Sequence, residues 1–116
     1  MSGLVPHLLD LWSNWQPVVA RRLFGGHGLY ADGCMFGLVA GELLYLKVDS
    51  DNRSVFEAEG LTPFVYERQG RAVALSFHRA PDAVLDDPAQ AAFWAGLALA
   101  AARRAQAVRG GKSRSR

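Results

Sequence analysis

The sequence contains little cysteine and no long apolar run. Cys34 is the only cysteine in 116 residues, so an internal disulfide is impossible, and chains without disulfides are typical of a reducing compartment. No stretch of about 18 apolar residues is present, which argues against a membrane-spanning helix. No Lys or Arg precedes Arg21, so the basic start of a signal peptide is missing. These absences predict a cytoplasmic protein with no membrane partner.

The sequence also lacks the spacings that are typical of metal and nucleotide sites. The three histidines and the cysteine show neither C-x-x-C nor i,i+4 spacing. Gly25, Gly26 and Gly28 form a glycine segment, but a phosphate loop needs Gly-Lys-Ser/Thr leading into a helix, and an Asp-Gly turn follows here instead. We interpret these glycines as allowing a bulge, a bend or a close backbone approach in a strand. We therefore expect no metal and no cofactor.

Charge is divided unevenly along the chain. The net charge is +2, yet residues 1–102 contain all 11 acidic residues and only seven of the 13 basic ones, a net charge of −4. We expect a folded domain at residues 1–108 and a basic, disordered tail at residues 109–116. The tail offers candidate phosphate contacts for weak, non-specific binding of nucleic acid, namely Arg109, Lys112, Arg114 and Arg116.

Apolar periodicity and turn residues predict the order of the elements. Leu4, Leu8 and Leu11 recur at helical spacing and indicate an amphipathic first helix. Asp32-Gly33 and Gln69-Gly70 are typical of hairpin turns. We expect strands at 21–30, 35–39, 42–48, 63–68 and 72–78, a helix between the third and fourth strands, and a last helix from Asp87-Pro88 to about Val108. This order predicts a two-layer α+β domain with an antiparallel sheet.

Several polar side chains are candidates for a functional site. Arg21 and Arg22 are adjacent in a strand, so their side chains point to opposite faces. We expect one to reach solvent or a partner and the other to lie over the sheet, and the two interpretations are an ion pair within the fold and an anchor for a partner's acidic group. A second hypothesis is a small-ligand binder or minor enzyme with His27, Tyr30 and Cys34 beside a pocket. The last helix is apolar around most of its girth, which makes a homodimer a further expectation. The candidate interaction residues are Arg21, Arg22, His27, Tyr30 and Lys47.

Three motifs taken together resemble the N-terminal domain of the TfoX/Sxy family. They are Arg21–Tyr30 (RRLFGGHGLY), Asp32–Leu38 (DGCMFGL) and Leu44–Asp49 (LYLKVD), with further agreement at Pro63-Phe64, Tyr66, Leu85-Asp86-Asp87 and Trp94. The resemblance covers roughly residues 4–105 and implies an α-β(3)-α-β(2)-α fold.

The same resemblance implies a bacterial regulator of competence for DNA transformation. In that family the protein acts as a transcriptional co-activator with the cyclic-AMP receptor protein. The family offers no catalytic residues, so we expect a non-enzymatic regulatory domain with a protein partner in transcription. The full-length regulators contain a second, C-terminal domain, which these 116 residues do not include.

Overall fold

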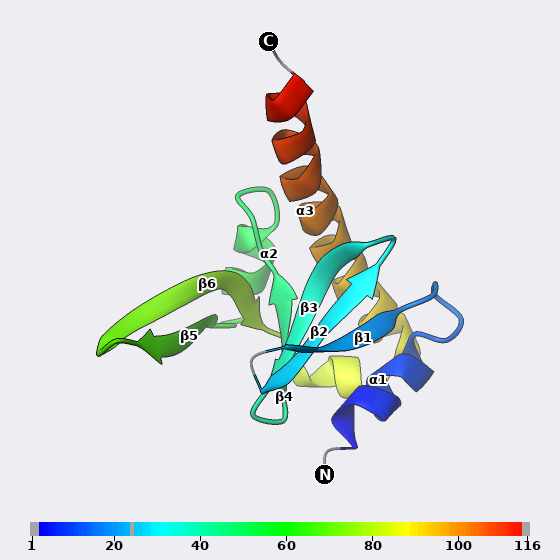
Figure 1. Ribbon diagram of the computed structural model, residues 1–116. Helices are drawn as coiled ribbons and strands as arrows, with labels where there is room; N and C mark the ends of the chain where they lie inside the picture. The colour runs from blue at the N-terminus through cyan, green and yellow to red at the C-terminus, as the bar shows by residue number, and fades with distance from the viewer. Residues whose placement is uncertain (1–2, 24, 115–116) are drawn as a thin grey trace.

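A computed structural model describes residues 3–23 and 25–114, with side chains through residue 108. The elements occur in the order helix, four strands, helix, two strands, 3₁₀ helix and helix (Figure 1). Their bounds are α1 Leu4–Leu11, β1 Val19–Leu23, β2 Gly26–Ala31, β3 Cys34–Ala40, β4 Leu43–Lys47, α2 Arg53–Ala58, β5 Pro63–Arg68, β6 Arg71–Arg79, η1 Asp82–Leu85 and α3 Pro88–Arg114. The predicted α+β class and the broad order of elements are confirmed.

All six strands form one antiparallel sheet in the order β1-β2-β3-β4-β6-β5. Tight turns join the strands of each hairpin. Asp32 and Gly33 have φ values of 53° and 74°, and Gln69 and Gly70 have 54° and 79°, as a type I′ turn requires. Both of these turns agree with the sequence prediction. The chain passes through α2 after β4 and returns so that β6 pairs with β4 and β5 lies at the edge.

The strand predicted at residues 21–30 is two strands joined by a turn. Leu23 pairs with Gly26 across this turn, and Gly25 within it has a φ of 80°. A positive φ at this position lets the chain reverse, whereas the glycines predicted only a bend or bulge in a continuous strand. The sheet therefore has four strands before α2 in place of the three predicted.

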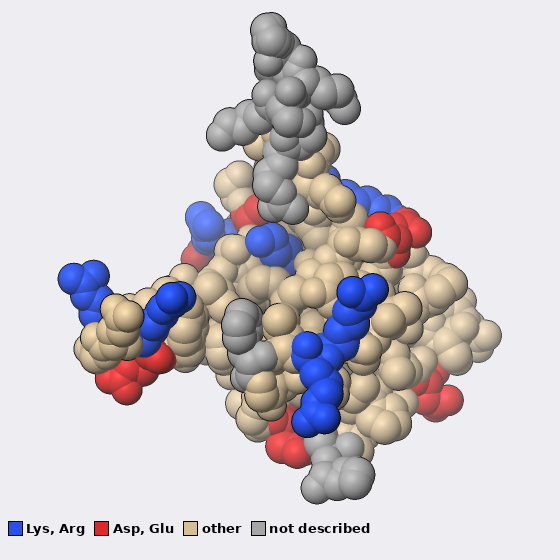
Figure 2. Space-filling model, in the orientation of Figure 1, with Lys and Arg blue, Asp and Glu red and all other residues tan. Residues whose placement is uncertain are grey.

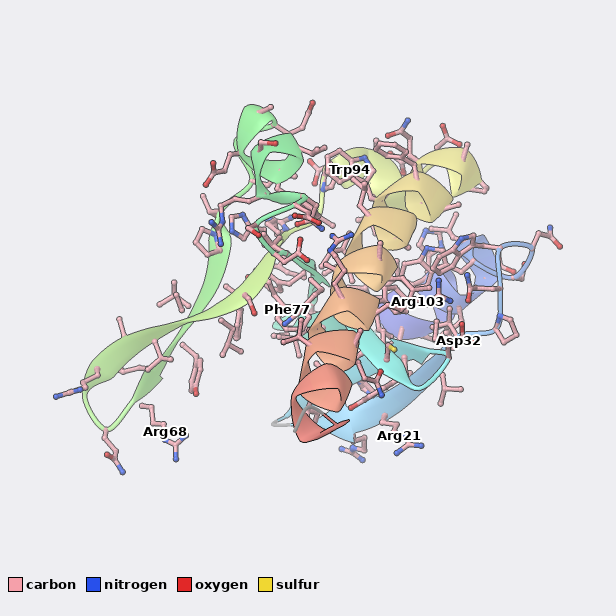
Figure 3. The ribbon with its side chains drawn as sticks, turned by 90° about the horizontal axis from the view of Figure 1, so that it is seen from above. Arg21, Asp32, Arg68, Phe77, Trp94 and Arg103 are labelled. Atoms are coloured by element: carbon pink, nitrogen blue, oxygen red, sulfur yellow. The ribbon has the colours of Figure 1, made fainter. Side chains whose placement is uncertain are left out.

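The helices cover one face of the sheet, as Figures 1 and 3 show. The core between the two layers contains the fully buried side chains of Trp12, Phe36 and Phe56. Trp12 donates its indole N–H to the carbonyl oxygen of Ala91 at 3.0 Å, which ties the segment after α1 to α3. Alanines line the buried side of α3, namely Ala91, Ala95, Ala98 and Ala102. Their small side chains let the helix lie close to β3 and β4.

Helix α3 continues past its predicted end. Its backbone is helical to Arg114, through Gly110 and Gly111, whereas the predicted helix ends at about Val108. Glycine inside a helix costs only about 1 kcal/mol relative to alanine, so two glycines do not by themselves end a helix. Among the described residues, no helix combines the length and apolarity needed to cross a bilayer. The division at residue 108 into a domain and a tail stays a prediction.

Candidate functional site

The glycine segment is explained by the geometry of the sheet. A Cβ atom built on Gly26 would lie 2.0 Å from the carbonyl oxygen of Val39 in the neighbouring strand β3. A Cβ on Gly28 would meet the side chains of Tyr30, Leu23 and Met35 at 3.1–3.2 Å. The interpretation that these glycines permit a close backbone approach is therefore confirmed for Gly26.

The face of the sheet opposite the helices, which we call the open face, contains an apolar groove. The groove has a volume of about 520 Å³ and is lined by residues of β1–β3 and of the β5–β6 hairpin. This hairpin projects from the rest of the sheet (Figure 1). Its lining includes Leu23, Met35, Leu38, Phe64, Tyr66, Arg68 and Leu75. The groove is thus formed by strands that are distant in the sequence.

Aromatic contacts hold one wall of the groove. The ring of Phe64 in β5 packs edge-on against Tyr45 in β4, with ring centroids 4.7 Å apart. Phe64 also stacks on Tyr66 at a centroid distance of 6.2 Å. Such pairs each contribute about 0.5–1.5 kcal/mol beyond the burial of their surface. They fix the hairpin beside β4, so the wall of the groove is formed before any partner arrives.

Positive charge collects at the strand positions of the open face. Side-chain alternation and strand register place five basic residues there, namely Arg21, Lys47, Arg68, Arg71 and Arg79. The one acidic residue in the described strands, Glu67, alternates with Tyr66 and Arg68 and so points to the other face. Figure 2 shows basic side chains on both sides of a broad uncharged area. Arg79 pairs with Asp82 at 3.7 Å, whereas Arg21, Arg68 and Arg71 form no ion pair among the described residues. The open face is therefore apolar in its groove, with basic side chains on both sides of it.

Arg21 and Tyr30, two of the predicted interaction residues, meet on the open face. The Arg21 guanidinium lies 5.4 Å from the centroid of the Tyr30 ring, within the range of a cation–π contact. Both residues also line a second hollow of about 260 Å³ with Pro17 and Val19. This hollow is smaller than the groove and lies beside β1.

The other predicted interaction residues are divided between the two faces. Arg22 and His27 are register partners, and alternation places both on the side of the helices. Lys47 lies on the open face, where its ammonium group is 5.2 Å from the centroid of the Phe77 ring. Among the described residues, neither Arg21 nor Arg22 forms an ion pair. The sequence left two roles open for these arginines, an ion pair within the fold and an anchor for a partner. The first of these roles is not formed among the described residues.

The three residues of the small-ligand hypothesis are not brought together. Tyr30 lies on the open face, whereas Cys34 lies on the helix side and is only 8 % exposed. Cys34 pairs in register with Ala31, and His27 pairs with Val39 at the opposite end of the β2–β3 hairpin. The thiol of Cys34 donates to Oε1 of Gln106 in α3 at 2.7 Å. Within the described residues, no three His, Cys, Asp or Glu side chains gather to hold a metal ion.

Two successive arginines of α3 hold the helix to the ends of strands. Arg103 pairs with Asp32 in the β2–β3 turn (Figure 3). Arg104 donates from Nε and Nη2 to the two carboxylate oxygens of Asp49, at 2.7 Å and 2.9 Å. These hydrogen bonds lower the pKa of Asp49 below its ordinary value of 3.8. The side chains of the predicted phosphate contacts Arg109, Lys112 and Arg114, and all of Arg116, lie outside the described residues.

The residues of the groove were not singled out by sequence reasoning. The alternation in Glu42–Val48 separates Tyr45 from Leu44 and Leu46, and so assigns two faces to β4. It does not say which face receives the helices. The signal that could have found the groove is the excess of aromatic and aliphatic residues on both alternating faces of the strands, since a sheet with one solvated face usually alternates apolar and polar residues.

Comparison with known proteins identifies the family. Residues 10–102 match the TfoX N-terminal domain. No curated protein matches the chain. The matched region runs from α1 into α3 and includes all six strands of the sheet. Because the match covers most of the 116 residues, this chain belongs to the TfoX N-terminal domain family.

Proposed function

We propose that this chain is a non-enzymatic, cytoplasmic interaction domain that takes part in regulating competence for DNA transformation, acting as a co-activator through a protein partner in transcription. Family membership supports the regulatory role. The observation that supports interaction is the apolar groove on the open face, which the described chain leaves uncovered. Exposed apolar surface of this kind is typical of binding sites for other proteins.

The placement of the ionisable groups supports binding in preference to catalysis. Asp32 and Asp49 are paired with arginines of α3 and hold the helix in place. His78 is buried, and its Nδ1 lies 2.9 Å from the carbonyl oxygen of Leu61. None of these three side chains lines the groove. A catalytic site requires titratable groups that converge on a cavity, and the groove contains Arg68 as its one charged side chain among the described residues.

The experiment that tests this function uses a matched pair of variants in strand β5. Tyr66 lines the groove, whereas its neighbour Val65 is 52 % exposed and alternates to the opposite side. A deletion strain should lose expression of the competence genes, and the wild-type chain or Val65→Ser should restore it. Tyr66→Ser should not restore it while accumulating to the same level. If Tyr66→Ser restores full expression, the groove does not serve this function.

A further inference from the structure

We infer that the groove on the open face binds an acidic segment of a partner protein, which inserts apolar side chains between β1–β3 and the β5–β6 hairpin. The inference rests on the proposed function and adds the chemistry of the partner. Apolar residues of the segment would pack on Leu38, Phe64 and Leu75 in the groove. Its carboxylates would meet the arginines at the margins.

The first observation is a pair of like charges in the β5–β6 hairpin. Arg68 and Arg71 are direct cross-strand partners beside the turn, and like charges in this position destabilise a sheet. Neither arginine forms an ion pair among the described residues. Glu67, their neighbour, points to the other face. A carboxylate from a partner would neutralise this pair, whereas the described chain itself supplies none there.

The second observation is that basic side chains lie on both sides of the groove. Figure 3 shows Arg21 and Arg68 on the side of the sheet away from α3, the first on β1 and the second on the projecting hairpin. Arg21 likewise forms no ion pair in the described part of the chain. Leu23 and Met35 line the groove between them. This arrangement matches a segment with apolar residues at its centre and acidic residues toward both ends.

Other occupants fit these charges less well. The chain's own C-terminal residues 109–116 contain four basic residues and no acidic ones, so they have the same sign of charge as the groove margins. A second copy of the chain could pair with the edge strand β1 in an antiparallel arrangement centred on Arg21. The Arg21 side chains of the two copies would then face each other, and like charges in that position are destabilising. A single-stranded nucleic acid is disfavoured because its bases bind by stacking on free aromatic faces, and the rings of Phe64 and Tyr66 already stack on each other.

The experiment measures fluorescence anisotropy of labelled peptides of about 15 residues. One peptide combines Leu and Phe at helical spacing with Asp and Glu. A second replaces the acidic residues with Lys, and a third replaces the apolar residues with Ser. We expect the first peptide to bind and the other two to bind at least about tenfold more weakly, because the groove requires both chemistries. Raising salt from about 0.1 M to about 0.5 M should weaken the first peptide severalfold.

Two charge-reversal variants locate the binding. Arg68→Glu should weaken the acidic peptide about tenfold or more. Arg53→Glu makes the same charge change at an exposed position in α2, on the helix side of the sheet, and should weaken binding less than about twofold. Thermal melting of both variants checks that each remains folded. Equal losses in the two variants, or equal binding of the acidic and basic peptides, would overturn the inference.

The remaining outcomes separate this inference from the proposed function. If no acidic peptide binds, yet Tyr66→Ser still abolishes expression of the competence genes, the groove has a partner of another chemistry and only the inference fails. If a single-stranded oligonucleotide binds more tightly than the acidic peptide and depends on Arg68, the occupant is a nucleic acid and the inference also fails. If the acidic peptide binds as expected but Tyr66→Ser leaves expression intact, the inference holds and the proposed function fails.

Discussion

Replacing Gly26 with alanine should damage the fold more than any other added methyl group in the glycine segment. The new Cβ atom would lie 2.0 Å from the carbonyl oxygen of Val39 and 3.2 Å from its carbonyl carbon. Real Cβ atoms do not approach such atoms more closely than 3.0 Å, so β2 and β3 would have to separate by about 1 Å. Both sides of this contact are backbone and cannot rotate away. We expect Gly26→Ala to lower the free energy of unfolding by about 3 kcal/mol or more.

The neighbouring glycines set the scale for this effect. Gly25→Ala meets no atom within 4 Å but has a φ of 80°, which costs a non-glycine residue about 1–2 kcal/mol. Gly28→Ala meets only the ends of flexible side chains at 3.1–3.2 Å, so we expect a cost of about 1 kcal/mol. Gly96 in α3 is the control, since a Cβ there meets nothing within 4 Å. Gly96→Ala should raise stability by about 0.5–1 kcal/mol.

Urea unfolding followed by tryptophan fluorescence measures the four variants. A domain of this size loses about 1–2 kcal/mol of stability per molar urea, so the midpoint of Gly26→Ala should fall by roughly 2 M. The midpoint of Gly96→Ala should rise slightly. A stability of Gly26→Ala within about 0.5 kcal/mol of the wild type, or a larger loss of stability in Gly28→Ala, would contradict this prediction. In either case the glycines would serve something other than strand pairing.

Three further predictions concern buried or paired polar groups. Asn52 is 3 % exposed and hydrogen-bonds three backbone groups, so Asn52→Ala should cost about 2–3 kcal/mol in urea unfolding, whereas Asn14→Ala at an exposed turn should cost less than about 0.5 kcal/mol. Arg104 lowers the folded-state pKa of Asp49 below 3.8, so this ion pair contributes stability above that pH and loses it as the pH falls further. Arg104→Gln should therefore be less stable than the wild type by about 1 kcal/mol near neutral pH, and the difference should shrink as the pH falls below 3.8; a constant difference at all pH values would contradict this. Cys34 should react with a thiol reagent much more slowly in the native protein than in urea, because it is buried; equal rates would show that the thiol is accessible.

The turns and helix starts could be predicted from the sequence because single residues determine them. Asp32-Gly33 needs two positive φ values, and few residue pairs other than Asp-Gly or Asn-Gly adopt them readily. Asp87 caps α3 by accepting a hydrogen bond from the N–H of Ala89 at 2.9 Å, and Pro88 begins the helix as its position predicts. These are local effects, and the sequence around each residue contains all the necessary information.

The candidate site could be predicted only in part because it depends on long-range packing. Adjacent positions in a strand place Arg21 and Arg22 on opposite faces, as predicted. That neither arginine forms an ion pair within the described part of the chain depends on where the carboxylates of the fold lie, and no local pattern gives that. The groove depends on the projection of the β5–β6 hairpin from the sheet, which brings Leu75 near Leu38. The turn at Gly25 also required the fold, since a glycine permits a bend and a reversal equally well.

The ion pairs of Arg103 and Arg104 join α3 to the sheet at two places. Arg103 reaches the β2–β3 turn and Arg104 reaches the connection after β4, so adjacent residues of one helix are tied to two separate points of the sheet. These ties oppose rotation of α3 about its axis and sliding along it. The backbone of α3 beyond them projects past the sheet (Figure 1). A partner seated in the groove would therefore contact a sheet whose helix layer is tied to it at two separate points.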